Sequence, residues 1–174
     1  MSYIPNLNLC CTGSVSIVSI PSLVLSLRIA YGTKINVFLT LSARKFITEF
    51  TFQALAGTRV FIEGEDAELP LELLSVPTLI APATANSIAA MGVGKVSHFA
   101  ASLSMQTRNK VFIAPAMHTT MWEQNSIRRA LASLRQYGYI IIEPGPGREI
   151  SDLSASESSL ASVDSIIKSL LTHL

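Results

Sequence analysis

The sequence predicts an α/β fold in which helices cover both faces of a parallel sheet. Six short apolar runs alternate with longer segments of helical character. Most of these runs are apolar throughout, which is typical of parallel strands that are buried on both faces. The length of 174 residues, without a long polar linker, predicts one domain over residues 1–174.

Each element can be placed from its local composition. The predicted strands are 7–12, 35–40, 59–62, 76–82, 110–116 and 139–143. The segments between them that are long enough for crossover helices are 14–31, 43–55, 84–105 and 119–137. The Pro- and Gly-rich stretch 143–150 predicts a mobile loop, and apolar residues at helical spacing predict a closing helix over 151–174.

The overall composition favours an oligomer without a membrane or nucleic-acid partner. Only 14% of the residues are charged and 49% are hydrophobic, which is more apolar than a typical soluble domain. We interpret the excess as subunit interface in a homo-oligomer. No apolar stretch reaches the ~18 residues of a membrane span, and a net charge of +1 without a basic run disfavours nucleic acid.

The cysteines and histidines indicate the compartment and argue against a metal site. Cys10 and Cys11 are adjacent in a predicted strand, so their side chains point to opposite faces and a disulfide between them is not expected. The first residues lack the basic region of a signal peptide, and both observations predict a cytoplasmic protein. Three scattered His and two adjacent Cys have no metal-ligand spacing, so we predict no metal.

Hydroxyl-bearing turns follow the first two strands. In CTGSVS, Gly13 permits a tight turn, while Thr12, Ser14 and Ser16 supply hydroxyls at a helix start. In TLSARKF, Thr40 and Ser42 do the same. Helix capping is the commoner explanation for one such turn. Two of them at the carboxyl edge of one parallel sheet predict an anion site.

The fourth and fifth strands end in a similar way, in IAPATANSIA and IAPAMHTTMW. In each, a Pro follows the apolar run and small or polar residues come next. Ala83 and Thr84 are small enough for a flat ligand to approach the backbone, and Asn86 supplies both a donor and an acceptor. These residues predict a ligand site beyond the strand ends.

These segments carry a resemblance to a known family. PATANS at 82–87 and PAMHTTMW at 115–122 resemble the PASANT and PxMNxxMW motifs of the homo-oligomeric flavin-containing cysteine decarboxylases, and GSVS and SARKFI follow the first two strands in the same order. The resemblance implies a single-domain Rossmann-like or flavodoxin-like three-layer sandwich. It also implies FMN, with FAD as the less common cofactor, bound at subunit contacts in trimers that can assemble into dodecamers.

The resemblance also implies roles for individual residues. The phosphate end of the flavin is expected at Thr12, Gly13, Ser14, Ser16, Thr40 and Ser42, and its ring system near Ala83, Thr84 and Asn86. Contacts to the substrate are expected from His118, Met121, Pro146 and Arg148.

Two branches of the resembled family decarboxylate cysteine carboxylates through a thioaldehyde that forms when flavin oxidises the side chain. The coenzyme A branch acts on phosphopantothenoylcysteine and uses a Cys in the loop after the last strand to return the electrons. This chain has no Cys beyond Cys11. We therefore expect an enethiol product from the C-terminal cysteine of a ribosomal precursor peptide, as in the aminovinyl-cysteine of lanthipeptides, linaridins and thioamitides.

The chain departs from the family motifs at the expected catalytic positions. Glu68 stands where the family has its active-site His, and His118 replaces the Asn of PxMNxxMW that anchors the substrate carboxylate. In the GxxDNL pattern, Ser97 and His98 replace Asp and Asn. We expect Glu68 and His118 to share the catalytic work in one of two ways: His118 takes the thiol proton beside an orienting Glu68, or a protonated His118 holds the carboxylate while Glu68 is the base.

Three alternatives to the peptidyl-cysteine assignment remain at this point. The first is a phosphopantothenoylcysteine decarboxylase, which the missing loop Cys and the two exchanges disfavour. The second is a non-catalytic flavin-binding regulator that has lost the catalytic His. The third is a flavin prenyltransferase, which should lack the PxMNxxMW-like segment.

Overall fold

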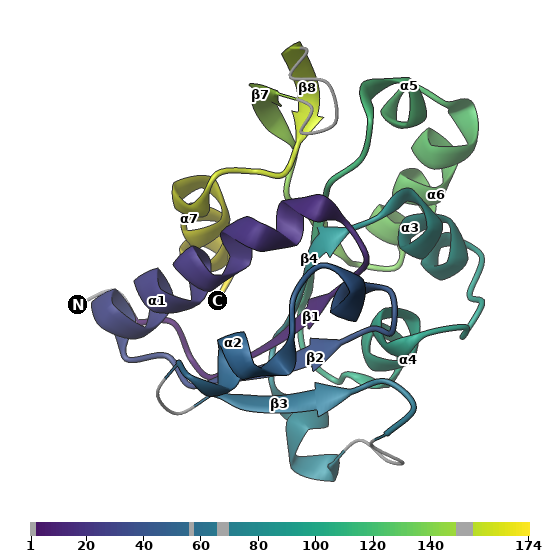
Figure 1. Ribbon diagram of the computed structural model, residues 1–174. Coiled ribbons are helices and arrows are strands. Elements are labelled where there is room, and N and C mark those ends of the chain that lie inside the picture. The colour runs from purple at the N-terminus through teal and green to yellow at the C-terminus, as the bar shows by residue number, and fades with distance from the viewer. Residues whose placement is uncertain (1–2, 56–57, 66–69, 149–154) are drawn as a thin grey trace.

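A computed structural model describes residues 3–55, 58–65, 70–148 and 155–174. It consists of a central sheet with a layer of helices on each face and a small hairpin above one end of the sheet (Figure 1). The predicted three-layer α/β fold is therefore confirmed.

The six predicted strands form one parallel sheet. They are β1 (Leu7–Cys11), β2 (Ile35–Leu39), β3 (Arg59–Ile62), β4 (Thr78–Ala83), β5 (Val111–Pro115) and β6 (Ile140–Ile141). Their order is β3-β2-β1-β4-β5-β6, and every adjacent pair is parallel. This is the Rossmann order. Successive strands are added on one side of β1 up to β3 and on its other side from β4 onward, so the order reverses between β1 and β4. Ligands bind at that reversal in open α/β sheets, which directs attention to the turns after these two strands.

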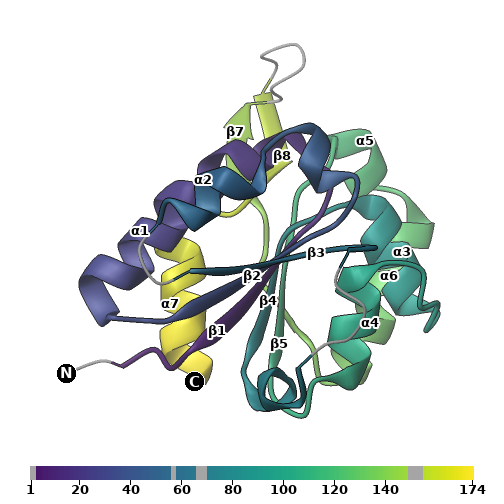
Figure 2. The ribbon, with the colours of Figure 1, turned by 60° about the horizontal axis from the view of Figure 1, so that its bottom comes forward.

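Helices cover the two faces in separate sets, as the view along the sheet shows (Figure 2). One face is covered by α1 (Ile20–Tyr31), α2 (Glu49–Gln53) and α7 (Val163–His173). The other is covered by α3 (Ala85–Gly92), α4 (Phe99–Gln106) and α6 (Asn125–Gln136). Short 3-10 turns lie at Val15–Ser19, Ala43–Lys45 and Leu71–Ser75.

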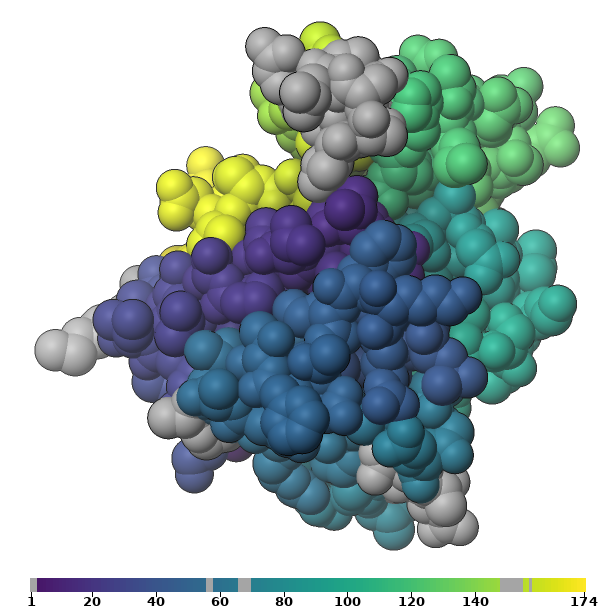
Figure 3. Space-filling view, viewed as in Figure 1, coloured from purple at the N-terminus to yellow at the C-terminus, as the bar shows by residue number. Residues whose placement is uncertain are grey.

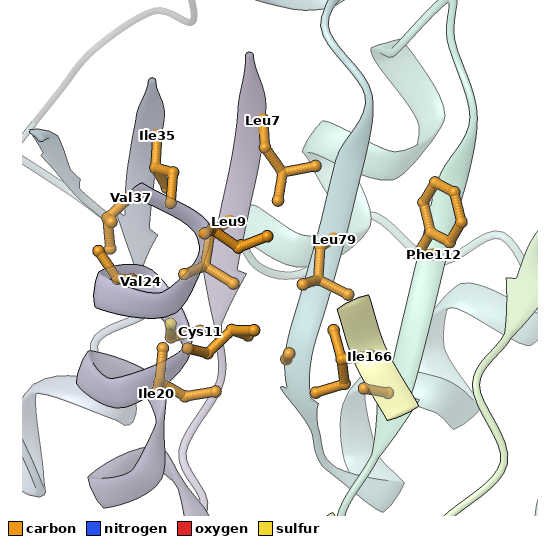
Figure 4. Close-up of a cluster of buried hydrophobic side chains, with 14 of the residues drawn as sticks. Leu7, Leu9, Cys11, Ile20, Val24, Ile35, Val37, Leu79, Phe112 and Ile166 are labelled. Atoms are coloured by element: carbon orange, nitrogen blue, oxygen red, sulfur yellow. The ribbon is translucent and has the colours of Figure 1, made fainter. Parts of the chain in front are cut away.

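The continuous apolar character of the strands is explained by burial on both faces. On one face, Leu7 and Leu9 of β1 and Leu79 of β4 pack against Val24 of α1 and Ile166 of α7 (Figure 4). On the opposite face, Phe38 and Ile80 pack among residues of α3, α4 and α6. All of these side chains are at most 1% exposed. Their burial supplies most of the driving force for forming the layers.

The two adjacent cysteines lie on opposite faces of β1, as predicted. Cys11 belongs to the cluster under α1 and α7, whereas Cys10 belongs to the cluster under α3, α4 and α6. Both are free and buried. Burial raises the pKa of both thiols well above the usual value, so they behave as small apolar core residues.

Two of the predicted crossover segments differ in detail from the structure. The segment 84–105 is two helices, α3 and α4, because Gly94 adopts a φ of 70° between them. The segment 119–137 is also two helices, α5 (Thr119–Trp122) and α6. The break before α4 gives that helix its own side-chain cap at His98, whereas Gln124 at the start of α6 makes no side-chain capping bond.

The expectation of a loop at 143–150 and of a helix throughout the tail is wrong in part. Gly145–Arg148 forms β7 and pairs antiparallel with β8 (Ala155–Ser159), and the closing helix α7 begins only at Val163. Gly147 fits this pairing because a Cβ there would stand 2.5 Å from Ser159 Oγ. None of the described helices is long and apolar enough to cross a membrane.

Candidate functional site

The turns after β1 and β4 are joined by the side chain of Thr12. Its hydroxyl donates to the carbonyl of Pro82 over 2.7 Å and accepts from the N–H of Thr84 over 3.1 Å. Thr12 is only 1% exposed. The hydroxyl therefore fixes the two turns to each other at the reversal of strand order, where Rossmann-type sheets bind their ligands.

The turns after β1 and β2 also meet. A Cβ built on Gly13 would lie 2.6 Å from Ser42 Cβ and 2.7 Å from Ser42 Oγ, so only glycine fits without a shift. Thr40, 2% exposed, donates its hydroxyl to the Cys11 carbonyl over 3.2 Å and lies 3.1 Å from Ser42 Oγ. In the space-filling view the atoms following β1 lie beside those following β2 (Figure 3).

The predicted flavin residues thus gather at one edge of the sheet but differ in exposure. Thr12, Thr40 and Ala83 are buried and shape the turns. Gly13, Ser14, Ser16 and Thr84 are half-buried, and Ser42 and Asn86 are exposed. Ser14 and Thr84 cap the helical turns that follow them, accepting from Ser16 N and Ser87 N. The groups that a ligand can reach are therefore the hydroxyls of Ser14, Ser16, Ser42 and Thr84 and the amide of Asn86.

His118 begins α5 as its N-cap. Nδ1 accepts from the Thr120 N–H over 3.3 Å and lies 2.9 Å from Thr120 Oγ1. The side chain is exposed. Because Nδ1 is the acceptor of the capping bond, the proton of a neutral imidazole resides on Nε2. His118 therefore presents an N–H donor to the outside of the turn.

His98 repeats this arrangement at the start of α4. Its Nδ1 accepts from the Ala101 N–H over 3.2 Å. Asn is a preferred N-cap because its side-chain oxygen accepts from the first turn, and imidazole Nδ1 does the same here. The two Asn-to-His departures from the family motifs, at His98 and His118, thus share one structural explanation.

The surroundings of the two histidines differ. Nε2 of His98 is buried and has no hydrogen-bond partner among the described residues. Burial lowers the pKa of His98 below its usual value, and the nearby Glu63 carboxylate opposes that shift. His98 is therefore held neutral, as a structural cap.

Glu63, at the end of β3, was not predicted from the sequence. Its two carboxylate oxygens accept from the Leu41 N–H over 2.8 Å and from the Phe99 N–H over 2.6 Å. One carboxylate therefore fixes the turn between Thr40 and Ser42 to the start of α4. A negative charge at a helix N-terminus is also favourable because of the helix dipole.

A second unpredicted group joins the hairpin to α5. Ser156 and Ser158 of β8 lie within hydrogen-bonding distance of Thr119, the first residue of α5. Figure 1 shows the hairpin beside α5. Buried serines in a low-complexity stretch such as SASESS give no sequence signal that distinguishes them from solvated ones.

The remaining residues predicted to contact the substrate lie on different elements, and one of the predicted catalytic residues is not described. Met121 is 51% exposed on α5, and Pro146 is exposed on β7. Arg148 ends β7. Glu68 lies outside the described residues. The pairing of Glu68 with His118 therefore stays a prediction.

A cavity of about 700 Å³ lies elsewhere, between α1 and α7, where residues such as Leu25, Ile29 and Ile167 line it. None of the predicted site residues is among those that line it. Its size does not make it the functional site, because ligands of open α/β sheets bind at the carboxyl ends of the strands, and this cavity is lined by residues of α1 and α7.

The sheet edge fits a flavin cofactor. Gly13 allows two turns to approach closely, the hydroxyls of Ser14 and Ser42 suit a phosphate, and the small side chains of Ala83 and Thr84 add little bulk at the end of β4. Asn86 can donate to and accept from such a ring.

Curated relatives of this chain include a bifunctional protein of coenzyme A biosynthesis and a probable phosphopantothenoylcysteine decarboxylase. It is 29% identical over 149 residues to the coenzyme A biosynthesis bifunctional protein CoaBC of Bacillus subtilis, covering 82% of this chain and 36% of that protein. It therefore spans about a third of the length of that relative. It is 28% identical to a Streptococcus mutans protein named "Probable phosphopantothenoylcysteine decarboxylase", covering 82% of this chain and 84% of that one.

Solved structures show the same fold in cysteine decarboxylases. The FMN-dependent cysteine decarboxylase TvaF from thioviridamide biosynthesis matches with a TM-score of 0.74 at 27% identity, covering 81% of this chain and 90% of that chain. SpaF, also an FMN-dependent cysteine decarboxylase, matches with a TM-score of 0.79 at 26% identity and coverages of 96% and 95%. The peptidyl-cysteine decarboxylase EpiD, 19% identical, matches in fold with a TM-score of 0.83, covering 97% of this chain and 99% of that chain.

The family model described as Flavoprotein matches residues 2–174. This match covers nearly the whole chain and confirms the predicted flavin cofactor at the level of the family, and FMN is the flavin named for TvaF and SpaF. The chain therefore belongs to the Flavoprotein family.

Proposed function

We propose that this chain is an FMN-dependent oxidative decarboxylase of the C-terminal cysteine of a peptide, and that it yields an enethiol of the aminovinyl-cysteine type. The proposal is supported by the fold shared with TvaF and SpaF and by the absence of any Cys after Cys11 in the sequence. A phosphopantothenoylcysteine decarboxylase is the second candidate, because a protein of that name from Streptococcus mutans is among the curated relatives.

The observation that carries the proposal is the geometry of His118. Its Nδ1 is engaged by Thr120, so its Nε2–H is the group offered to a ligand. Asn at an N-cap likewise accepts with its oxygen and keeps its N–H₂ group as a donor. In this proposal His118 acts as the donor that holds the substrate carboxylate, which favours Glu68 as the group that takes the thiol proton.

The other residues have positioning roles. The hydroxyls of Ser14 and Ser42 hold the phosphate of FMN at the ends of β1 and β2, and Thr84 and Asn86 lie along its ring system. Met121, Pro146 and Arg148 contact the peptide. When bound, the flavin supplies the two-electron oxidation of the cysteine side chain that allows the carboxylate to leave as CO₂.

The protein is proposed to work as a homo-oligomer in the cytoplasm. Large exposed apolar side chains support an interface, among them Phe50 at 71% and Ile29 at 83% exposure. A trimer, with further assembly to a dodecamer, is the arrangement that the family resemblance implies.

Mass spectrometry tests the function directly. A peptide ending in Cys is incubated with the FMN-loaded protein, beside phosphopantothenoylcysteine as the competing substrate. Loss of CO₂ and two hydrogens from the peptide, with the second substrate unchanged, is expected. Turnover of phosphopantothenoylcysteine alone would favour the second candidate, and no turnover of either would overturn both.

Two variants of one residue test the assigned role of His118. His118→Asn keeps an acceptor for the cap and a donor for the carboxylate, so it is expected to retain activity. His118→Ala removes both and is expected to lower activity by about 100-fold or more, because a charge-assisted hydrogen bond to the substrate is lost. Equal loss in both variants would instead make His118 the base.

A further inference from the structure

Three hydroxyls form a closed cluster between the β7–β8 hairpin and α5. Thr119 Oγ1 lies 3.1 Å from Ser158 Oγ and 3.3 Å from Ser156 Oγ, and the two serine oxygens are 3.3 Å apart. Ser156 and Ser158 belong to β8, whereas Thr119 is the first residue of α5. The cluster therefore joins two segments that are about 40 residues apart in the sequence.

The hydrogen bonds of the cluster run from donor to acceptor toward a carbonyl beside His118. Ser158 Oγ donates to the carbonyl of Met117 over 2.9 Å. A serine hydroxyl has one proton, so in the contact with Thr119 the threonine is the donor and Ser158 accepts. The backbone N–H of Ser158 donates to Ser156 Oγ over 3.2 Å. The carbonyl at the end of this chain of bonds belongs to the residue that precedes His118.

The serine hydroxyls are shielded from water while the hairpin is seated against α5. Ser156 is 3% exposed and Ser158 is fully buried. A buried hydroxyl without a partner is costly, and hydrogen bonds in a chain strengthen one another where water is excluded. Only the docked hairpin pairs these hydroxyls with Thr119 and Met117, so the network selects one position of β8 against α5.

We infer that the Thr119, Ser156 and Ser158 hydroxyls form a positioning device that fixes the β7–β8 hairpin to the segment carrying His118 and thereby sets the two walls of the peptide site. One wall is α5, with His118 and Met121, and the other is β7, with Pro146. Ser158 acts through Met117 and β8 and does not touch the reacting atoms. The peptide role of these walls rests on the proposed function, whereas the docking of the hairpin does not.

Hydrogen exchange tests the docking without flavin or substrate. In Ser158→Ala, the amides of 155–159 are expected to exchange at least about tenfold faster than in the wild type, because loss of a buried hydrogen bond changes an equilibrium by about that factor. Amides of β1 are expected to keep wild-type rates, which shows that the fold is intact. Unchanged exchange at 155–159 would overturn the inference.

Two further variants make the comparison specific. Ser159→Ala, on the same strand but outside the hydroxyl cluster, is expected to leave exchange at its wild-type rate. Thr119→Val removes the donor while preserving shape, and is expected to reproduce Ser158→Ala. Combining the two is expected to add little, because both break one chain of bonds. Full additivity of the two effects would contradict a shared network.

The consequence for the reaction is a change in peptide binding. Ser158→Ala and Thr119→Val are expected to raise KM for the peptide by about tenfold, with kcat and FMN affinity much less affected. Wild-type KM in both variants would overturn the positioning role. If the wild-type protein converts no peptide, the proposed function fails, and the exchange data alone decide the docking of the hairpin.

Discussion

Gly13 and Ser42, in the turns that follow β1 and β2, stand so close that a Cβ on Gly13 would lie 2.6 Å from Ser42 Cβ. The backbone of Gly13 does not need a positive φ, so the requirement for glycine is one of space alone. The two turns that carry most of the expected phosphate ligands can meet only because this side chain is missing.

Gly13→Ala is therefore expected to push the two turns apart. Overpacking of this kind costs about 1–3 kcal/mol of unfolding free energy, and FMN affinity should fall with it. Chemical denaturation and flavin titration measure the two effects. Gly145→Ala is the control, because a Cβ there meets no atom within 4 Å. Equal stability of both variants would show that Ser42 moves aside without cost.

Thr12→Val tests the structural role of this hydroxyl. Valine keeps the shape but leaves the Thr84 N–H without its acceptor and removes the donor to the Pro82 carbonyl. A loss of about 1–3 kcal/mol in unfolding free energy is expected. Thr172→Val, at an exposed position of α7, is the control and should change stability by less than about 0.5 kcal/mol. A fully stable Thr12→Val variant would contradict the argument.

The strands were predictable because their signal is local. Each is a continuous apolar run, and the observed bounds lie within about two residues of the predicted ones, as at β1 and β5. The break between α5 and α6 has no such signal, since Glu123 and Gln124 are good helix residues. The strand β7 was missed because GPGR is poor strand sequence, and its pairing depends on β8.

The site was predictable only where it follows a strand directly. Thr12, Gly13, Thr40 and Ser42 converge because parallel strands end at the same edge of a sheet. Glu63 was missed because its partners, Leu41 and Phe99, are 22 and 36 residues away in the sequence. A local sequence pattern cannot predict the role of a carboxylate whose partners are brought to it only by tertiary folding.

The neutral state of His98 predicts a pH dependence of stability. Burial lowers its pKa in the folded state, with Glu63 acting in the opposite direction. Between the lowered folded pKa and the ordinary unfolded value near 6.5, the unfolded chain binds more protons, so stability rises with pH. The contribution is complete above pH of about 6.5 and declines as the pH falls below it.

His98→Asn keeps a cap acceptor but removes the titrating group. The unfolding free energy of this variant, measured by denaturation between pH 7 and pH 5, is expected to fall less steeply than that of the wild type. His173→Asn, exposed at the end of α7, is the matched variant that replaces a histidine outside this site. An unchanged slope in His98→Asn would show that the titration of His98 does not contribute to the pH dependence of the unfolding free energy.

The bridging of Leu41 and Phe99 by Glu63 leads to the last prediction. Glu63→Gln retains one acceptor oxygen and places an N–H₂ group against the second backbone N–H, so one bond becomes a clash between donors. The unfolding free energy is expected to fall by about 1–3 kcal/mol, and FMN affinity should fall because Leu41 lies between Thr40 and Ser42.

Glu65→Gln is the matched control, because this exposed carboxylate pairs only with Arg44 among the described residues. Surface ion pairs contribute about 0–1 kcal/mol, so this variant should remain near wild type in both measurements. If Glu63→Gln loses stability but binds FMN normally, the carboxylate supports the fold without shaping the cofactor edge. If it loses both, the turn after β2 depends on a residue at the end of β3 for its ligand-binding geometry.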